Sequence, residues 1–442
     1  MDSSSSGYVV GIGECLIDRI NGKDFLGGAP VIFTYHAARS GNLGIVISGR
    51  GNDKEGDYLE KELRKKRLDS RLAIIPDSHS GVVEVDASDP HNPQYNIDMN
   101  AAWTKFPLPE NYESIAAKAK AVYFGPLASY CGDISKTSVD RFLAKVSQDC
   151  FIIFDVNLRY NPDDKGNYTK HLFDFDIIEG YIKKCNVLKV NIDELNYLSD
   201  KLKIEGGEMH KCRMILALYP NVNMLIVTMG GDGSTVYWRG NDNRISFSSL
   251  GMPVEVNNRS GAGDALAGAL IGTILKRKDK DIWKDKGKLY VSAHHAAVRR
   301  SALVCEEGNS MPRVEEYDLF ISYSRKDEKV IDNYFLKKFQ DSGLSIWLDR
   351  DKVSTGDEFT PEIEQGIIDS SVVVYFSSRA ANRSKYVTAE LQSALDNGKP
   401  VIPIKLDGTP YSKAVRSRLE VLDFMDCTLS KLMDDIKKQM DY

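Results

Sequence analysis

The chain is poor in cysteine, has no marked excess of either charge, and contains no long apolar run. Its seven cysteines are scattered and form no C-x-x-C pair, which argues against a disulfide framework or a zinc site and favours a reducing compartment. Lys and Arg number 58 against 63 Asp and Glu, so no basic field points to nucleic acid as a partner. No stretch approaches the length of a membrane span, and residues 1–7 are polar rather than a signal peptide. We therefore expect a cytoplasmic protein without a membrane partner.

With 442 residues, the chain is long enough for two or three domains. Up to residue 313, short apolar segments alternate with helical patterns, which predicts a parallel sheet covered by helices. We expect strands at 8–13, 45–48, 121–124, 151–155, 187–190 and 224–228, and helices at 31–40 and 55–66. Segments 81–86 and 94–97 alternate apolar and polar residues, which indicates a small, half-exposed sheet or lid.

The stretch Ser260-Gly261-Ala262-Gly263-Asp264 precedes an Ala-rich run that has the pattern of a buried helix. Its two glycines allow the backbone to approach a ligand closely, and the free N–H groups of a helix start favour an anion. Asp264 therefore lies where a phosphate can be held while its carboxylate takes a proton from an attacking hydroxyl. The alternative is a Gly-rich turn capped by an aspartate.

Six motifs follow one another along this part of the chain: Gly13-Glu14 with Asp18, Gly27-Gly28-Ala29-Pro30, Asp155-Val156-Asn157-Leu158-Arg159, Asn191-Ile192-Asp193-Glu194, Thr228-Met229-Gly230 with Gly233, and Gly261-Ala262-Gly263-Asp264. In this order they resemble the ribokinase-like (PfkB-type) carbohydrate kinases, and among these the fructokinase-like members. The resemblance implies a three-layer α/β/α domain with a small β lid over residues 7–313. It also implies transfer of the γ-phosphate of ATP to a hydroxyl of a sugar or nucleoside.

The resemblance further implies a role for each motif. Asp264 is expected to be the catalytic base, with residues 261–263 (Gly261, Ala262 and Gly263) as the anion hole. Asn191 and Glu194 are expected to organise Mg²⁺ and phosphate, with Glu194 as the metal ligand; the alternative for this pair is a strand-to-helix cap. The residues expected to line the nucleotide are Thr228, Gly230 and Gly233. The residues expected to hold the acceptor are Asp18, Gly28 and Arg159.

Two positions depart from the family pattern. Ile32 stands where the family usually has an Asn that contacts sugar hydroxyls, and Asn258-Arg259 stand where the family usually has Asp-Thr. An apolar side chain does not replace a hydroxyl-binding amide, and losing such contacts costs orders of magnitude in discrimination. The sequence therefore leaves two alternatives for this domain: a kinase that turns over, or a module that senses a nucleotide or nucleoside.

After residue 316, a second alternation of strands and helices begins. We expect strands at 317–322, 345–348, 372–376, 401–404 and 422–427, and helices at 329–339, 361–368 and 384–395. Continuously apolar strands that alternate with helices predict a small, doubly wound parallel sheet over residues 316–442.

This second domain resembles the Toll/interleukin receptor (TIR) family, whose fold is flavodoxin-like. The matching features are residues 317–324, Trp347-Leu348-Asp349 with the loop to Gly356, Ser370-Ser371, Ser377-Ser378 and Glu390. In catalytic members, the Glu at this helix position is essential for cleaving NAD⁺ at the nicotinamide–ribose bond, and a neighbouring TIR domain often completes the site through the loop here formed by residues 349–359. The residues expected to line the NAD⁺ pocket are Ser322, Tyr323, Ser324 and Trp347. Strand-end hydroxyls also form turns, and a tryptophan here also suits the core.

Helix geometry gives a separate argument about Glu390. At about 100° per residue, it lies roughly 40° from Ala394 and roughly 60° from Val387, within the apolar stripe of its helix. An inward carboxylate is unusual unless it is paired or functional. Loss of nicotinamide leaves an oxocarbenium-like ribose that a carboxylate stabilises. The alternative is a glutamate at the edge of the stripe that reaches to water.

Three hypotheses follow from the two resemblances. In the first, the protein is an NAD⁺ glycohydrolase or cyclase of bacterial anti-phage defence, self-associating through its TIR domains, whose kinase-like domain senses or phosphorylates a sugar or nucleoside. In the second, it is an active ATP- and Mg²⁺-dependent kinase whose TIR domain serves only assembly. In the third, it is a receptor in which neither domain turns over.

Overall fold

The computed structural model divides the chain into two compact units, residues 1–312 and residues 313–442. The structure describes residues 7–20, 22–39, 42–86, 94–130, 132–158, 160–162, 168–171, 174–240, 243–254, 256–277, 285–311, 317–341, 344, 346–348, 363, 366–367, 369–397 and 399–411. Within these residues, no helix is both long and apolar enough to cross a membrane.

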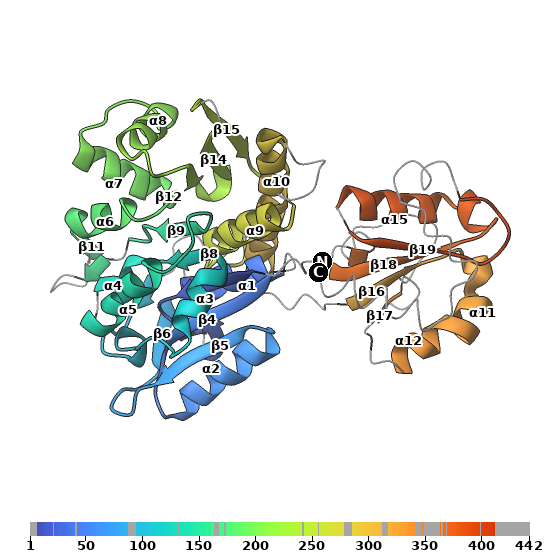
Figure 1. Ribbon diagram of the computed structural model, residues 1–442, viewed down its shortest axis with the longest axis horizontal. Helices are drawn as coiled ribbons and strands as arrows, with labels where there is room; N and C mark the ends of the chain where they lie inside the picture. The colour runs from blue at the N-terminus through green and yellow to red at the C-terminus, as the bar shows by residue number, and fades with distance from the viewer. Residues whose placement is uncertain are drawn as a thin grey trace. The chain divides into compact units, whose positions relative to one another are not determined.

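The N-terminal unit is built on a nine-stranded sheet (Figure 1). In spatial order its strands are β15 (Ile245–Leu250), β14 (Ser234–Arg239), β13 (Met224–Thr228), β12 (Val187–Asn191), β9 (Phe151–Asp155), β8 (Ala119–Phe124), β1 (Tyr8–Ile12), β4 (Leu43–Arg50) and β5 (Asp69–Ile74). The strands from β13 to β5 pair in parallel, while β14 and β15 pair antiparallel at one edge. The predicted parallel sheet is thus confirmed.

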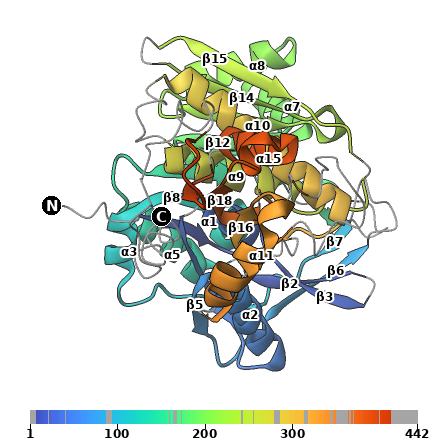
Figure 2. The ribbon, with the colours of Figure 1, turned by 90° about the vertical axis from the view of Figure 1, so that its right-hand side faces the viewer.

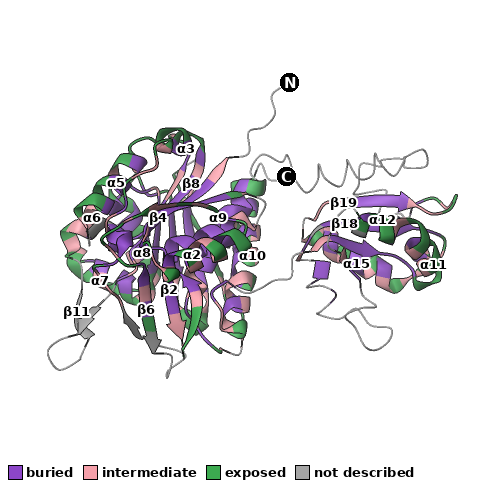
Figure 3. Ribbon diagram, turned by 90° about the horizontal axis from the view of Figure 1, so that it is seen from below, coloured by how far each residue is buried: buried purple, intermediate pink, exposed green. Residues whose placement is uncertain are grey.

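Helices cover both faces of this sheet. One face carries α1 (Ala29–Ala38), α9 (Ala262–Arg277) and α10 (Lys286–Glu307), and the other carries α3 (Tyr112–Lys118), α5 (Asp133–Leu143), α6 (Phe175–Ile182), α7 (Ile192–Leu202) and α8 (Glu208–Leu218). Successive strand residues enter opposite cores, as Val9 and Val10 do, because side chains alternate along a strand. Figure 3 shows the buried strands running between the helices. This is the expected three-layer α/β/α arrangement.

A second, four-stranded sheet in this unit has the order β3 (Lys23–Gly27), β2 (Leu16–Ile20), β6 (Gly81–Asp86), β7 (Gln94–Asn96). Figure 2 shows these strands grouped at one side of the unit. Strands β6 and β7 confirm the small sheet that their alternation predicts, whereas β2 and β3 were not anticipated. Asp18 lies on β2, so the small sheet carries one of the predicted acceptor-binding residues.

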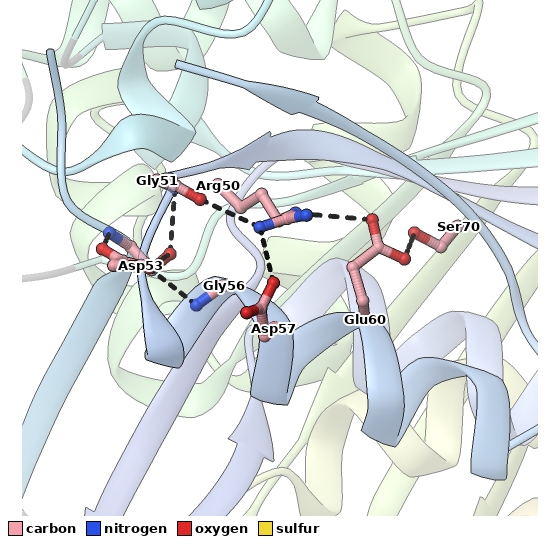
Figure 4. A network of polar contacts seen from close by, with 8 residues as sticks. Arg50, Gly51, Asp53, Gly56, Asp57, Glu60 and Ser70 are labelled. Atoms are coloured by element: carbon pink, nitrogen blue, oxygen red, sulfur yellow. Dashed lines mark hydrogen bonds and ion pairs between the residues drawn. The ribbon is translucent and has the colours of Figure 1, made fainter. Parts of the chain in front are cut away.

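Helix α2 (Lys54–Lys65) is anchored by a polar network at its N-terminus (Figure 4). Asp53 accepts hydrogen bonds from Gly56 N at 2.7 Å and from Ser80 N and Oγ at 2.8 and 2.6 Å. Burial opposes ionisation, but these hydrogen bonds prevail and lower the pKa of Asp53. Arg50 ends β4 and pairs with Glu60 of the helix at 3.6 Å. The network therefore fixes α2 to the sheet and to the segment leading into β6.

The C-terminal unit contains a four-stranded parallel sheet with the order β17 (Ile346–Trp347), β16 (Tyr317–Ser322), β18 (Ser370–Ser377), β19 (Val401–Lys405). Helical segments include α11 (Glu328–Ile331), α12 (Lys337–Asp341) and α15 (Lys385–Asp396). The predicted strand 422–427, the loop 349–359 and part of the predicted helix 361–368 lie outside the described residues. The remaining elements agree with the predicted doubly wound sheet.

Candidate active sites

Asp264 lies in the first turn of α9, directly after the glycine-rich turn that the sequence singled out. Gly261 has a φ of +78°, and a Cβ added there would lie 2.6 Å from Ser310 Cβ and 3.0 Å from Ile32 Cδ1. Only glycine combines this backbone conformation with this space. The turn thus places its N–H groups and the Asp264 carboxylate at the carboxyl edge of the sheet.

Three buried residues surround the Asp264 carboxylate. Lys189 Nζ lies 2.5 Å from Asp155 Oδ2 and 3.3 Å from Asp264 Oδ1. The Tyr123 hydroxyl lies within hydrogen-bond distance of the same two carboxylates, at 2.9 Å from Asp264 Oδ1, and shares its one proton between them. Asp155, Lys189 and Tyr123 come from the neighbouring strands β9, β12 and β8, which explains how residues far apart in sequence meet. Asp264 Oδ1 is therefore engaged by two donors.

The charges of this cluster are set by burial and by one another. Burial raises the pKa of Asp264, and Asp155 adds to the rise while Lys189 opposes it. Burial alone would lower the pKa of Lys189, but the two carboxylates more than compensate and raise it, so the ammonium stays charged. Burial and the same carboxylates raise the pKa of Tyr123, which keeps its phenol protonated as a donor. The result is an ionised lysine that bridges two acids.

Sequence reasoning did not find Tyr123 or Lys189 as site residues, and it noted Asp155 only within a motif. A signal was present for Lys189, because a lysine in the apolar run Val187-Leu188-Lys189-Val190 is unusual in a buried strand. Its partners, Asp155 and Asp264, can be identified only once the strand order is known.

Asn191 and Glu194 form a capping box at the start of α7. Glu194 N donates to Asn191 Oδ1 at 2.9 Å, and Asn191 N donates to Glu194 Oε2 at 2.7 Å. Glu194 Oε1 accepts from Leu158 N at 2.8 Å, and burial raises the pKa of this carboxyl to about 7. The helix-cap alternative is thus realised. Both carboxylate oxygens hold backbone N–H groups and the side chain is buried, so Glu194 does not fit direct metal ligation as it stands; its role with Mg²⁺ stays a prediction.

Within the described residues, no group of three or more His, Cys, Asp or Glu side chains is suited to hold a metal ion. Magnesium in nucleotide sites is commonly held by phosphates and water with few protein ligands. In the part of the chain that the structure describes, this site therefore contains no dedicated set of protein ligands for Mg²⁺.

The predicted nucleotide residues follow strand β13. Thr228 ends β13 and pairs in register with Asn191, and Gly230 and Gly233, with φ of +58° and +91°, lie at the tight turn that follows. A Cβ on Gly263 would lie 4.0 Å from Thr228 Cγ2, so this turn and the Gly261–Gly263 turn are neighbours. The structure thus brings the turn predicted to line the nucleotide close to the turn predicted to form the anion hole.

The predicted acceptor residues are only partly described. Asp18 is buried on β2, and Gly28, with a φ of +102°, is the N-cap of α1. Arg159 lies outside the described residues. Ile32, one of the two departures from the family pattern, is buried on α1 and packs against the Gly261 turn.

In the C-terminal unit, Glu390 lies on the buried side of α15, as its place in the apolar stripe predicts. Its side chain is held at the end of β16, where the Ser322 hydroxyl donates to Glu390 Oε2 at 2.6 Å. The two residues are 5% and 1% exposed, so a carboxylate and its donor are both withdrawn from solvent. A charge-assisted hydrogen bond of this length fixes the orientation of the carboxylate.

Further polar contacts lie beyond the end of β16. Tyr323 and Ser324 are both buried, and Ser324 caps the turn that follows by accepting from Lys326 N at 3.4 Å. The Ser378 hydroxyl, just after β18, donates to Asp327 Oδ2 at 2.5 Å. Sequence reasoning did not single out Asp327. These contacts tie together the loops at the carboxyl edge, where ligands bind in open α/β sheets.

Trp347 packs in the core of this unit. Its ring stacks on Phe320 with centroids 4.7 Å apart, and it is buried among Ile363, Ile367 and Val373. Trp347 is thus a core residue of this unit, and its contact with NAD⁺ stays a prediction.

Comparison with known proteins identifies both units. Residues 21–315 match the family model of pfkB family carbohydrate kinases, and residues 319–436 match that of the TIR domain. The chain therefore belongs to the pfkB carbohydrate kinase family. It carries a TIR domain after the kinase domain.

Relatives of the two parts have different descriptions. A putative sugar kinase of Pyrococcus horikoshii is 29% identical over 292 residues, covering 63% of this chain and 86% of the relative. A probable fructokinase of Arabidopsis thaliana is 22% identical over 306 residues, covering 65% of this chain and 83% of the relative. A probable 2′ cyclic ADP-D-ribose synthase of Methanobrevibacter olleyae is 33% identical over 98 residues, which are 22% of this chain and 29% of that protein.

Solved structures agree with the kinase fold. The sugar kinase of Pyrococcus horikoshii has a TM-score of 0.54 at 24% identity, covering 69% of this chain and 93% of that one. A fructokinase of Vibrio cholerae, solved with fructose, ADP and calcium, has a TM-score of 0.56 at 19% identity, covering 70% and 96%. At these identities the likeness establishes the ribokinase-like fold.

Proposed function

We propose that the TIR module (residues 316–442) cleaves NAD⁺ at the nicotinamide–ribose bond, as a glycohydrolase or a cyclase, and that the kinase module (residues 7–313) senses or phosphorylates a sugar or nucleoside. The observation that carries the proposal is the buried Glu390 carboxylate, oriented by Ser322 at the carboxyl edge of a TIR sheet. The name of the Methanobrevibacter olleyae relative supports chemistry at an ADP-ribose unit. The resemblance of both modules to known families supports a cytoplasmic defence protein that self-associates through its TIR domains.

The proposed cleavage needs little more than a placed carboxylate. The bond from the ribose anomeric carbon to the nicotinamide nitrogen breaks, and its electron pair leaves with the nicotinamide. Glu390 stabilises the positive charge that develops on the ribose, and Ser322 keeps the carboxylate aimed. Water then attacks the anomeric carbon in hydrolysis, or a hydroxyl of the same molecule attacks it in cyclisation.

In the kinase module, Asp264 is the proposed base that takes the proton of the acceptor hydroxyl. Lys189 and Tyr123 hold one of its oxygens, which leaves the other to face the acceptor. The N–H groups of the Gly261 turn stabilise the negative charge on the transferring phosphate. Mg²⁺, which enters with ATP, supplies further neutralisation of the phosphate charge.

The test is nicotinamide release from NAD⁺ by the full chain. Glu390→Gln keeps the size of the side chain but removes its charge, and we expect a loss on the order of 10²-fold or more, the scale seen when one preorganised group is removed. Asp396→Asn makes the same exchange at an exposed position of α15 and should leave the rate unchanged. Wild-type rates in Glu390→Gln would contradict the proposal.

The second candidate function is an active sugar or nucleoside kinase whose TIR module serves assembly alone. The intact cluster around Asp264 favours it, because a base, a fixed cation and a glycine turn are all in place. ADP formation with one of a panel of acceptors, absent in Asp264→Asn and unaccompanied by nicotinamide release, would favour this candidate. A chain with neither activity would leave the receptor alternative.

A further inference from the structure

Arg259 lies between β15 and α9, one residue before the turn that begins α9. The preceding Asn258 is buried and shapes the turn, because its Oδ1 accepts from Ser260 N at 2.9 Å. Arg259 contributes its carbonyl to the same turn, accepting from Ala262 N at 3.1 Å. The turn is thus held by the Asn258 side chain and the Arg259 carbonyl, and the Arg259 side chain takes no part in these two hydrogen bonds.

The guanidinium of Arg259 lies against the other glycine turn, after β13. A Cβ added to Gly230 would be 3.0 Å from Arg259 Nη1, and one added to Gly231 would be 3.7 Å from Nη2. Glycine at 230 therefore leaves room for the arginine as well as allowing the positive φ. Arg259 therefore connects the turn predicted to line the nucleotide with the turn predicted to form the anion hole.

Arg259 is half-buried, and its guanidinium makes no hydrogen bond or ion pair in the part of the chain that the structure describes. Lys189, a second cation beside the Gly261 turn, is neutralised by Asp155 and Asp264. An arginine carries up to five N–H donors in a planar fork that matches phosphate oxygens. A charged fork that has no acceptor among the described residues, and that lies between two glycine turns, is suited to bind an anion.

We propose that Arg259 binds the terminal phosphates of a nucleoside triphosphate in the kinase module, bridging the Gly230 and Gly261 turns. The inference rests on the proposed nucleotide site and adds a residue that replaces a family hydroxyl by a cation. It predicts that the module discriminates by phosphate number, with ATP and ADP gaining from Arg259 and AMP gaining little.

The test is isothermal titration of the full chain with a slowly hydrolysed ATP analogue and with AMP, in the presence of Mg²⁺. Arg259→Gln should weaken binding of the ATP analogue about 10- to 100-fold, the range for a charged hydrogen-bonded contact, and change AMP binding less than about threefold. Arg259→Lys should fall between, because an ammonium keeps the charge without the fork. Arg213→Gln, at an exposed position of α8, is the matched control and should bind like the wild type.

The outcomes distinguish a phosphate-binding role of Arg259 from a structural role and from the absence of a nucleotide site. A selective loss of ATP-analogue affinity in Arg259→Gln, with an unchanged melting temperature, supports the inference. Unchanged ATP-analogue affinity overturns it, and so does an equal loss for AMP and the ATP analogue, which would indicate a structural role. If the wild type binds neither nucleotide, the proposed nucleotide site is wrong and the inference is wrong with it. If the wild type binds the ATP analogue and Arg259→Gln binds it equally well, only the role of Arg259 is overturned.

Discussion

At the scale of single residues, the kinase unit depends on Lys189 as an internal counter-ion. Its ammonium is buried between Asp155 and Asp264, and the Tyr123 hydroxyl contacts the same two carboxylates. Removing one partner of a buried ion pair leaves uncompensated charge in a low dielectric. The cluster is therefore both a stabilising element and the setting of the proposed base.

We predict that Lys189→Met lowers the free energy of unfolding by about 3–5 kcal/mol, the usual cost of breaking a buried pair. Lys184→Met serves as the control, because Lys184 pairs with Asp140 at 2.8 Å but is half exposed, and its loss should cost about 1 kcal/mol or less. Denaturant unfolding of the full chain, followed by the transition of the N-terminal unit, measures both. Equal effects of the two variants would contradict the assigned role of Lys189.

Lys189→Met should also change how the rate of acceptor phosphorylation depends on pH. Asp264 must be ionised to act as a base, so the rate falls as pH falls through its pKa. Burial raises that pKa above the ordinary 3.8, and the positive charge of Lys189 opposes the rise. Removing Lys189 therefore moves the acid limb of the kcat/KM profile to higher pH. A shift to lower pH would contradict this electrostatic account.

Residue-scale features differed in how far the sequence revealed them. The inward position of Glu390 follows from helix periodicity alone, because residues three and four apart share a face. The hydrogen bond from Ser322 to Glu390 and the contacts of Lys189 do not follow from periodicity. They join elements that are far apart in the sequence, and no local pattern specifies which elements become neighbours. Side-chain partners of this kind become visible only once β8, β9 and β12 are known to be neighbours.

At the scale of elements, the start of α9 is the critical structure. The Gly261 turn is packed against Ser310 and Ile32, and it leads directly into the helix turn that carries Asp264. A side chain at 261 would meet packed atoms and strain a positive-φ backbone at once. The turn is therefore the element at which stability and the proposed nucleotide binding coincide.

We predict that Gly261→Ala destabilises the N-terminal unit by about 1–3 kcal/mol, the cost of a non-glycine residue in a strained backbone region, and weakens ATP binding. Gly180→Ala is the matched control: it lies within α6 with no atom within 4 Å of the added Cβ, and it should be neutral or stabilising by up to about 1 kcal/mol. Thermal unfolding and ATP titration of both variants provide the check. Wild-type stability and affinity in Gly261→Ala would show that the turn tolerates a side chain.

Strands were predictable where the sequence is continuously apolar, and less so where apolar and polar residues are mixed. The buried strands β9, β12 and β13 read as continuous apolar runs, which is why 151–155, 187–190 and 224–228 were anticipated. Strand β2 carries Asp18 and Arg19, and β15 is an exposed edge strand, so neither presents such a run. Their place is fixed by pairing with β3, β6 and β14 rather than by local preference.

At the scale of the whole molecule, one chain carries a kinase fold and a TIR fold as separate compact units. Each unit has its own apolar cores and its own carboxylate at the carboxyl edge of a parallel sheet, Asp264 in one and Glu390 in the other. In the proposed defence function, the TIR unit carries out the chemistry and the kinase unit recognises a ligand. The position of bond cleavage in NAD⁺ is therefore the central claim.

Mass spectrometry of the products formed from NAD⁺ by the full chain tests this claim most directly. We predict free nicotinamide together with an equal amount of ADP-ribose, or of its cyclic form lighter by one water, and neither product from Glu390→Gln. Nicotinamide mononucleotide with AMP would show cleavage of the pyrophosphate instead. That result, or the predicted products appearing undiminished in Glu390→Gln, would contradict the account.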